Sequence, residues 1–173
     1  MITAVESAIV LVVPEAQPLL ESVWEQTGAQ RTGMPAHVTL LYPFAAEPDA
    51  GVVEELRFFF AGVDGFSLTF SSLGEFPEVV FLAPDEAAEC VQLTEALARR
   101  WPDFPPYSGG FDRVVPHLTV VKTAAPDLRE RVREAVAGGL PVRAAVTEAS
   151  LWTRSDDESW RCLATFPLGP AEP

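Results

Sequence analysis

Two stretches of this chain, about eighty residues apart, share one pattern. The first reads PAHVTLLYPFAAEPD, from Pro35 to Asp49, and the second reads PHLTVVKTAAPD, from Pro116 to Asp127. In both, a histidine closely follows a proline, a threonine stands two positions later, and an Ala-Ala pair precedes Pro-Asp. A repeated frame of this kind predicts an internal duplication of one structural unit, and it constrains the fold more than any other feature of the chain.

The two histidines of the repeated frame, His37 and His117, are the only histidines in the protein. The β-branched and apolar residues around each of them predict a strand. Because side chains alternate between the faces of a strand, His37 and Thr39 point the same way, and so do His117 and Thr119. If the two halves pair about a pseudo-two-fold axis, both His/Thr pairs face one shared cleft.

The remaining elements follow from apolar periodicity and from Gly and Pro punctuation. We expect helices over 15–26, 49–62, 85–100 and 127–137, and further strands over 7–13, 66–76, 78–82, 141–153 and 160–168. Asp127 and Glu130 have the spacing of a capping box. The segment over 102–116, PDFPPYSGGFDRVVP, predicts an extended loop. No linker is long enough to separate domains, so residues 1–173 form one domain with half-repeats centred on 37–60 and 117–137.

Composition limits the partners and the location of the protein. The chain has 173 residues, 48% of them hydrophobic, which is enough for a core, and no apolar run long enough to span a bilayer. It lacks a secretory signal, and Cys90 and Cys162 are too few for a disulfide framework, so we expect a cytoplasmic protein. A net charge of −13 argues against long nucleic acid and anionic membrane as partners. A small phosphorylated ligand held by local donors remains compatible with this charge, and we expect a monomer.

Two imidazoles across one cleft suit general acid–base catalysis. With pKa values near ~6.5, one imidazole can accept a proton while the other, charged, donates one. The hydroxyls of Thr39 and Thr119 can donate hydrogen bonds to phosphoryl oxygens. A phosphodiester or cyclic phosphate needs these same groups, namely an activated oxygen nucleophile, a protonated leaving oxygen and donors for the equatorial oxygens.

HVTL and HLTV resemble the two signature motifs of the 2H phosphoesterase superfamily, which includes the 2′–5′ RNA ligase-like proteins. The segments FPPYSGGFDRVVPHLTV and SLWTRSDDESWRCLATFPL are similar to that family's flanking segments. The resemblance implies a bilobal α+β fold in which antiparallel sheets face a central cleft with helices outside. It also implies metal-independent, cofactor-free chemistry on 2′,3′-cyclic phosphates or 2′–5′ linkages, with His37 and His117 catalytic and Thr39 and Thr119 binding phosphate. The acidic charge favours a small nucleotide or short oligonucleotide end over a large RNA.

Other residues are weaker candidates for substrate binding. Aromatic side chains can stack on a base, and an arginine can contact phosphate or base. The candidates are Phe44, Tyr107, Phe111, Trp152 and Arg154. Arg113 and Lys122 are fainter candidates, since on simple alternation Lys122 points away from His117.

Three alternatives stay open at this point. The protein could be a non-catalytic or regulatory module that binds a nucleotide or RNA end in the same cleft. It could be a zinc enzyme, although His37 and His117 lack a short chelating spacing and no His/Cys/Asp/Glu cluster flanks them. It could also be a structural or interaction domain, which would leave the repeated frame unexplained.

Overall fold

The structure is a computed structural model that describes residues 4–110 and 113–170. Its strands are β1 (Ala4–Val12), β2 (His37–Phe44), β3 (Phe66–Phe76), β4 (Val79–Pro84), β5 (Leu118–Lys122), β6 (Val142–Val146), β7 (Glu148–Ser155) and β8 (Trp160–Pro167). Its α-helices are α1 (Gln17–Thr27), α2 (Ala50–Ala61), α3 (Ala87–Arg100) and α4 (Pro126–Ala137). Two 3₁₀ turns, η1 (Pro14–Ala16) and η2 (Pro106–Gly109), complete these elements.

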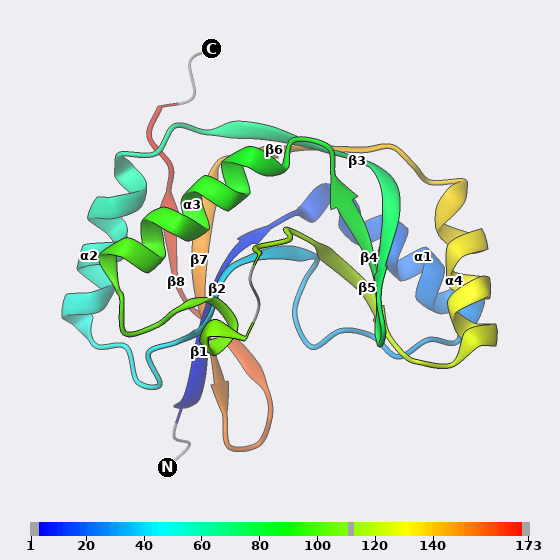
Figure 1. The fold of residues 1–173 in the computed structure, drawn as a ribbon, viewed down its shortest axis with the longest axis horizontal. Helices are drawn as coiled ribbons and strands as arrows, with labels where there is room; N and C mark the ends of the chain where they lie inside the picture. Colours follow the sequence, from blue (N-terminus) through cyan, green and yellow to red (C-terminus); the bar gives the residue numbers. More distant parts are fainter. Residues whose placement is uncertain (1–3, 111–112, 171–173) are drawn as a thin grey trace.

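The strands form two antiparallel sheets of four strands each (Figure 1). One sheet has the order β2-β1-β7-β8 and the other has the order β5-β4-β3-β6. Each sheet therefore combines strands from the N-terminal and C-terminal halves of the chain. The two strands that carry the repeated frame, β2 and β5, each lie at the edge of a different sheet and approach one another. The predicted α+β fold with antiparallel sheets is confirmed.

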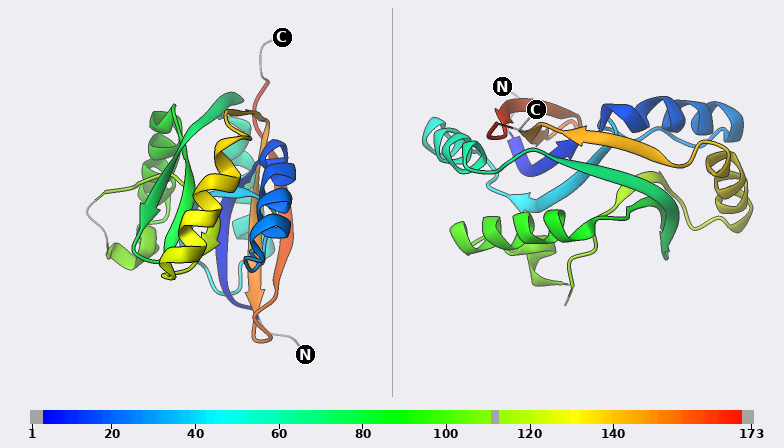
Figure 2. Two further views of the ribbon diagram at one scale, coloured as in Figure 1. Left: turned by 90° about the vertical axis from the view of Figure 1, so that its right-hand side faces the viewer. Right: turned by 90° about the horizontal axis from the view of Figure 1, so that it is seen from above.

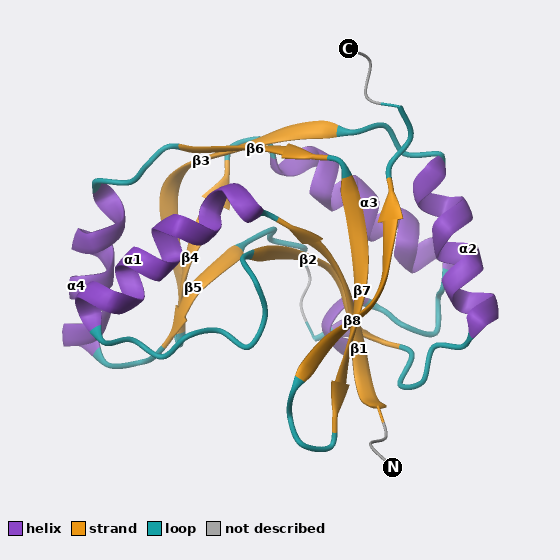
Figure 3. Cartoon of the chain, turned by 180° about the vertical axis from the view of Figure 1, so that it is seen from behind, coloured by secondary structure: helices purple, strands orange, loops and turns teal. Residues whose placement is uncertain are grey.

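The helices lie at two ends of the molecule, outside the sheets (Figures 1 and 3). Helices α1 and α4 pack against each other at one end, and α2 and α3 lie at the other, where α2 contacts β8 and α3 contacts β2. Figure 2 shows the same arrangement from the side and from above. With helices on the outer sides, the faces of β2 and β5 that carry the histidines stay open to a shared space.

One large apolar cluster runs through the described residues and includes side chains from both sheets and all four helices. The indole N–H of Trp24 on α1 crosses this core to donate to the carbonyl of Val120 on β5, at 2.9 Å. On α3, the hydroxyl of Thr94 donates to the carbonyl of Leu40 on β2, at 2.6 Å. A buried backbone acceptor left without a donor would cost about 1–3 kcal/mol, so these two bonds anchor helices directly to the edge strands of the site.

Two sequence predictions need correction. The single strand expected over 141–153 is two strands in different sheets, because the buried positions change parity from Val142, Ala144 and Val146 to Ala149 and Leu151. In a single regular strand the buried residues stay two positions apart, because side chains alternate between the two faces. The change of parity therefore marks the point where the chain crosses from one sheet to the other.

The predicted capping box at the start of α4 is also wrong. The helix begins one residue earlier, with Ala125 as its N-cap and Pro126 in its first turn, and no side chain caps it. Proline is favoured at this position because a backbone N–H here would have no partner within the helix, so its absence costs nothing. Glu130 pairs with Arg133 instead of reaching back. By contrast, Asp49 does cap α2, where its carboxylate accepts from the backbone N–H of Val52.

Gly74 offers a test of how tightly the wall behind the second histidine is packed. A Cβ at this position would overlap the ring of Phe81, which is itself only 5% exposed. We expect Gly74→Ala to lower the free energy of unfolding by about 1–3 kcal/mol, because the ring has no room to move away. Urea denaturation measures this effect. Gly138→Ala is the matched control, since a Cβ there meets nothing within 4 Å, and its stability should not fall. Equal stability of the two variants would contradict the close packing.

Candidate active site

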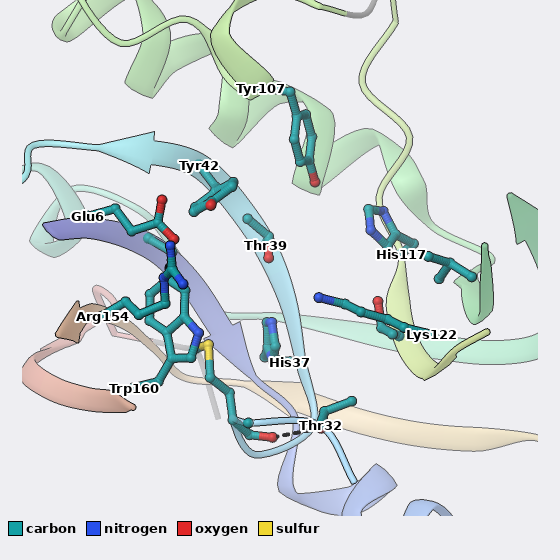
Figure 4. A pocket seen from close by; sticks show the side chains of 15 residues that line it. Glu6, Thr32, His37, Thr39, Tyr42, Tyr107, His117, Lys122, Arg154 and Trp160 are labelled. Carbon is teal, nitrogen blue, oxygen red and sulfur yellow. Dashed lines mark hydrogen bonds and ion pairs between the residues drawn. The ribbon is translucent and has the colours of Figure 1, made fainter. Parts of the chain in front are cut away.

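A pocket of about 480 Å³ lies between β2 and β5 and receives both His/Thr pairs (Figure 4). His37 and Thr39 enter it from β2, and His117 and Thr119 enter it from β5 and the residue before it. All four side chains are half-buried. The pocket thus brings together the four residues that the sequence singled out, and its volume is in the range of small-molecule sites.

The two imidazoles are held in the same way. The Nδ1 atom of His37 lies 2.7 Å from the carbonyl oxygen of Pro35, and Nδ1 of His117 lies 2.8 Å from the carbonyl oxygen of Val115. A carbonyl oxygen can only accept, so Nδ1 carries the proton in each ring. In the neutral imidazole, Nε2 is then the proton acceptor. The residue two positions before each histidine therefore sets its tautomer.

A β-bulge follows each His/Thr pair at the same position of the repeated frame. In β2, Thr39 pairs with Val10 and Leu41 pairs with Ile9, so Leu40 has no partner of its own. In β5, Thr119 pairs with Phe81 and Val121 pairs with Val80, so Val120 is the extra residue. The two consecutive residues at each bulge, Leu40–Leu41 and Val120–Val121, are all buried. An extra residue shifts the alternation by one and re-aims the next side chain.

The bulges bring a third residue of each strand into the pocket. Tyr42 and Lys122, each five positions after its histidine, both line it. Simple alternation predicted that Lys122 points away from His117, and the bulge at Val120 is the physical reason why that prediction is wrong. The two strands are alike in geometry but differ in chemistry, because one delivers a phenol and the other a cation.

Burial and nearby charge lower the pKa of both imidazoles. For His37, burial has the largest effect, and the charges of His117 and Lys122 add to it, against the opposing hydrogen bond to Pro35. For His117, burial again dominates and Lys122 adds to it, against the hydrogen bond to Val115. Burial and these charges therefore favour the neutral form of both rings in the free protein. Lys122 acts on both rings, which places its charge close to both proposed proton-transfer groups.

Two phenylalanines support the ring of His117. Phe76 meets it edge-on with centroids 5.1 Å apart, and Phe81 lies at 5.4 Å. The rings of Phe76 and Phe81 also contact each other at 4.5 Å. With the carbonyl of Val115 on its Nδ1, the imidazole is fixed in position and in rotation.

Known proteins share the sequence pattern and the fold of this chain. The family model described as the 2′-5′ RNA ligase superfamily matches residues 12–158, which is most of the chain. The chain belongs to the 2′-5′ RNA ligase superfamily. It is a member of the 2H phosphoesterases, as the paired motifs predicted. A search of curated protein sequences found no matching relative for this superfamily member.

Solved structures of the superfamily share the fold over nearly the whole chain. E. coli LigT in its apo form gives a TM-score of 0.62 at 19% identity and covers 97% of this chain and 99% of its own. E. coli LigT complexed with 3′-AMP gives 0.60 at 23% identity, with coverage of 98% and 100%. The protein TT0787 of Thermus thermophilus gives 0.60 at 18% identity, with coverage of 94% and 97%. At these identities the likeness shows the fold alone.

The weaker candidates of this 2H phosphoesterase have different outcomes. Tyr107 and Arg154 line the pocket. Phe44 lies in the core instead, 4% exposed and packed against Phe104 at 5.0 Å. A second register shift in β2, between the pairs Ile9–Leu41 and Ser7–Phe44, returns its side chain to the helix side of the strand. Trp152 packs against the small cluster beside the pocket and donates its N–H to Ser150 at 2.9 Å. Phe111 lies outside the described residues.

Sequence reasoning missed a group of pocket residues. They are Glu6, Tyr42 and Trp160, with Thr32, Gly33 and Met34 on the loop before β2. Glu6 and Trp160 are far apart in the chain and become neighbours only through the order β1-β7-β8. The hydroxyl of Tyr42 donates to the Glu6 carboxylate, and burial together with this bond raises the pKa of Tyr42 to about 12. No sequence signal marks Glu6 or Trp160, whereas the five-residue spacing from the histidine could have pointed to Tyr42.

Within residues 4–110 and 113–170, no group of three His, Cys, Asp or Glu side chains gathers to hold a metal ion. No helix in the described part of the chain is long and apolar enough to cross a membrane. The acidic residues 156–158 lie in the exposed turn between β7 and β8 of this phosphoesterase fold.

The lowered pKa values predict a pH effect on stability. Each histidine binds its proton less readily in the folded than in the unfolded chain, so its contribution is fully present above about pH 6.5 and is lost as pH falls toward the folded-state pKa. We expect the free energy of unfolding to fall more steeply between pH 7 and 5 in the native protein than in the variant His37→Gln/His117→Gln. Urea denaturation at several pH values measures both slopes. Parallel slopes would contradict the assignment.

Proposed function

We propose that this protein is a metal-independent phosphoesterase that acts on a small nucleotide, with a 2′,3′-cyclic phosphate or a 2′–5′ linkage as its substrate. The observation that carries the proposal is the shared pocket of His37 and His117, each with Nδ1 donating to a backbone carbonyl. General acid–base catalysis needs one imidazole to accept a proton and the other to donate one. Family membership supports phosphoester chemistry, and the site residues support this mechanism for it.

Hydrolysis of a cyclic phosphate would run through the two Nε2 atoms. The neutral imidazole takes a proton from water as the water oxygen forms a bond to phosphorus. The P–O bond to a ribose oxygen breaks, and the other, protonated imidazole gives its proton to that oxygen. The two histidines end with their protonation states exchanged, and solvent restores them. The pseudo-symmetric pocket allows either histidine to serve as base, according to the direction of the reaction.

Thr39, Thr119 and Lys122 would stabilise the charge that develops on the phosphoryl group. Each hydroxyl can donate to a non-bridging oxygen, and both lie on the face of their strand that carries the histidine. The ammonium group of Lys122 adds a positive charge at the same end of the pocket (Figure 4). In the pentacoordinate transition state this charge is worth more than in the ground state, because the negative charge on the oxygens increases.

The size and the charge of the protein favour a small substrate. The pocket of about 480 Å³ suits a mononucleotide or the end of a short oligonucleotide. The net charge of −13 opposes a long polyanion. LigT of E. coli has been solved with 3′-AMP, NADP+ and ATP, all of them small nucleotides, and this supports a similar class of ligand here. A monomeric state and a cytoplasmic location stay predictions from the sequence.

Substitution of the site residues tests the mechanism. We expect His37→Ala and His117→Ala each to lower kcat on nucleoside 2′,3′-cyclic phosphates by about 10²–10⁴-fold, because each removes one proton-transfer group. Thr39→Val and Thr119→Val should cost less, since each removes a single hydrogen bond. Steady-state kinetics in excess chelator measures these effects on folded variants.

The same experiment separates the enzyme from a non-catalytic binding module. Native protein that binds these nucleotides but turns over none of the cyclic and 2′–5′-linked substrates would support the module. Native-like rates in either histidine variant would exclude the paired-histidine mechanism. Loss of activity in chelator would argue for a metal enzyme.

The pH profile tests the role of Lys122. Because both imidazoles have lowered pKa values, we expect kcat/KM to follow a bell with its maximum below about pH 6.5. Lys122→Met removes a charge that lowers both pKa values, so the maximum should move to higher pH while its height falls. Lys122→Arg keeps the charge and should keep the position of the maximum. An unmoved maximum in Lys122→Met would show that Lys122 does not act on the histidines.

A further inference from the structure

The pocket has a second end whose chemistry differs from that of the phosphate end. Glu6 on β1, Arg154 on β7 and Trp160 on β8 are direct cross-strand neighbours, since Glu6 pairs with Arg154 and Arg154 pairs with Trp160. All three line the pocket. In Figure 4 they lie on the side opposite Lys122 and His117. Three adjacent strands therefore present a fixed row of one carboxylate, one guanidinium and one indole.

Arg154 does not make this end a second phosphate site, because acidic groups compensate its charge. Its Nε donates to Oε1 of Glu6 at 2.5 Å, and its Nη1 lies 3.9 Å from a carboxylate oxygen of Glu158. The summed charge of Arg154, Glu6 and Glu158 is thus negative rather than positive. A phosphate would be repelled here, whereas a neutral group with both donors and acceptors would find partners.

Three aromatic rings line the pocket beside the ion pair or next to one another. The ring of Tyr42 lies 6.3 Å from that of Trp160 and 6.4 Å from that of Tyr107, which borders the pocket from η2. Tyr107 reaches this place with φ at 50°, a left-handed conformation that costs a bulky residue about 1 kcal/mol or more. Flat apolar faces beside a compensated ion pair are the features that bind a nucleobase, by stacking and by edge contacts.

We propose that this end of the pocket is a base subsite that selects guanine. This inference rests on the proposed function, which puts the phosphate at the histidine end. Glu6 keeps acceptor capacity beyond its bonds to Arg154 and Tyr42, because a carboxylate has about four acceptor positions. It accepts from N1–H and N2–H of guanine, and a terminal N–H of Arg154 donates to O6.

The same row disfavours adenine and cytosine. Adenine and cytosine present an unprotonated ring nitrogen where guanine presents N1–H, and this lone pair would face the carboxylate of Glu6. Uracil has one ring N–H and a carbonyl in the right order, but it lacks the second donor of guanine and has a smaller face to stack. The expected order of affinity is guanine first, uracil second, and adenine and cytosine last.

Binding of the four 3′-mononucleotides to the full chain tests the subsite without any need for turnover. By isothermal titration calorimetry we expect 3′-GMP to bind about tenfold or more tightly than 3′-AMP. Glu6→Gln should reduce this preference to near one, because one of the two acceptor oxygens becomes an NH2 group that would face an N–H of guanine. Glu158→Gln is the matched control, since it removes a charge near Arg154 from a side chain that is 86% exposed, and it should keep the preference.

The outcomes separate this inference from the proposed function. Equal or tighter binding of 3′-AMP, no binding of any 3′-mononucleotide, or a guanine preference that survives in Glu6→Gln would each overturn the subsite. If Glu6→Gln does not fold, the order of the four nucleotides on the native protein still decides. A guanine preference without turnover would uphold the subsite and reject the enzyme, and histidine-dependent turnover without base preference would do the reverse.

Discussion

The site depends on a one-residue irregularity in each of two edge strands. A regular strand that carried a histidine and a threonine on its cleft face would place its fifth residue after the histidine on the core face. The extra residues Leu40 and Val120 shift the alternation, so Tyr42 and Lys122 reach the pocket. The bulges are tolerated here because the consecutive apolar side chains at each one are buried in a core that lies under both sheets.

The two strands share this geometry, but the third residue breaks the chemical symmetry. Lys122 places a positive charge beside both histidines, whereas Tyr42 connects through its hydroxyl to Glu6 at the opposite end. A symmetric pocket could hold a nucleotide in two opposite orientations. A cation at one end and an aromatic, charge-compensated end at the other favour a single orientation, in which the proposed phosphate and base sites are separate.

The acidic net charge of the protein and the positive charge of Lys122 at the histidine end of the pocket are compatible because they act over different ranges. The net charge of −13 acts over about a Debye length and is screened by salt, so it governs which large partners approach. Lys122 and the two half-buried imidazoles act at contact distance, where burial weakens screening. Burial lowers the pKa of both imidazoles, and an anion bound beside them would favour the protonated form of one ring.

The sequence alone pointed to His37 and His117 as the proposed proton-transfer groups, because the chain contains no other histidine. It also determined the fold class and the helix positions, since these depend on periodicity within single segments.

Only the tertiary structure decided the rest of the pocket. A bulge depends on which residue of the partner strand lies opposite. The row of Glu6, Arg154 and Trp160 depends on strand pairing that joins Glu6 to Arg154, 148 positions away in the chain. The placement of Phe44 in the core had the same origin, since its exposure is set by what α3 and the residues after it bring against β2. Local patterns carry no record of such pairings, because they arise from contacts that form only when the two sheets assemble.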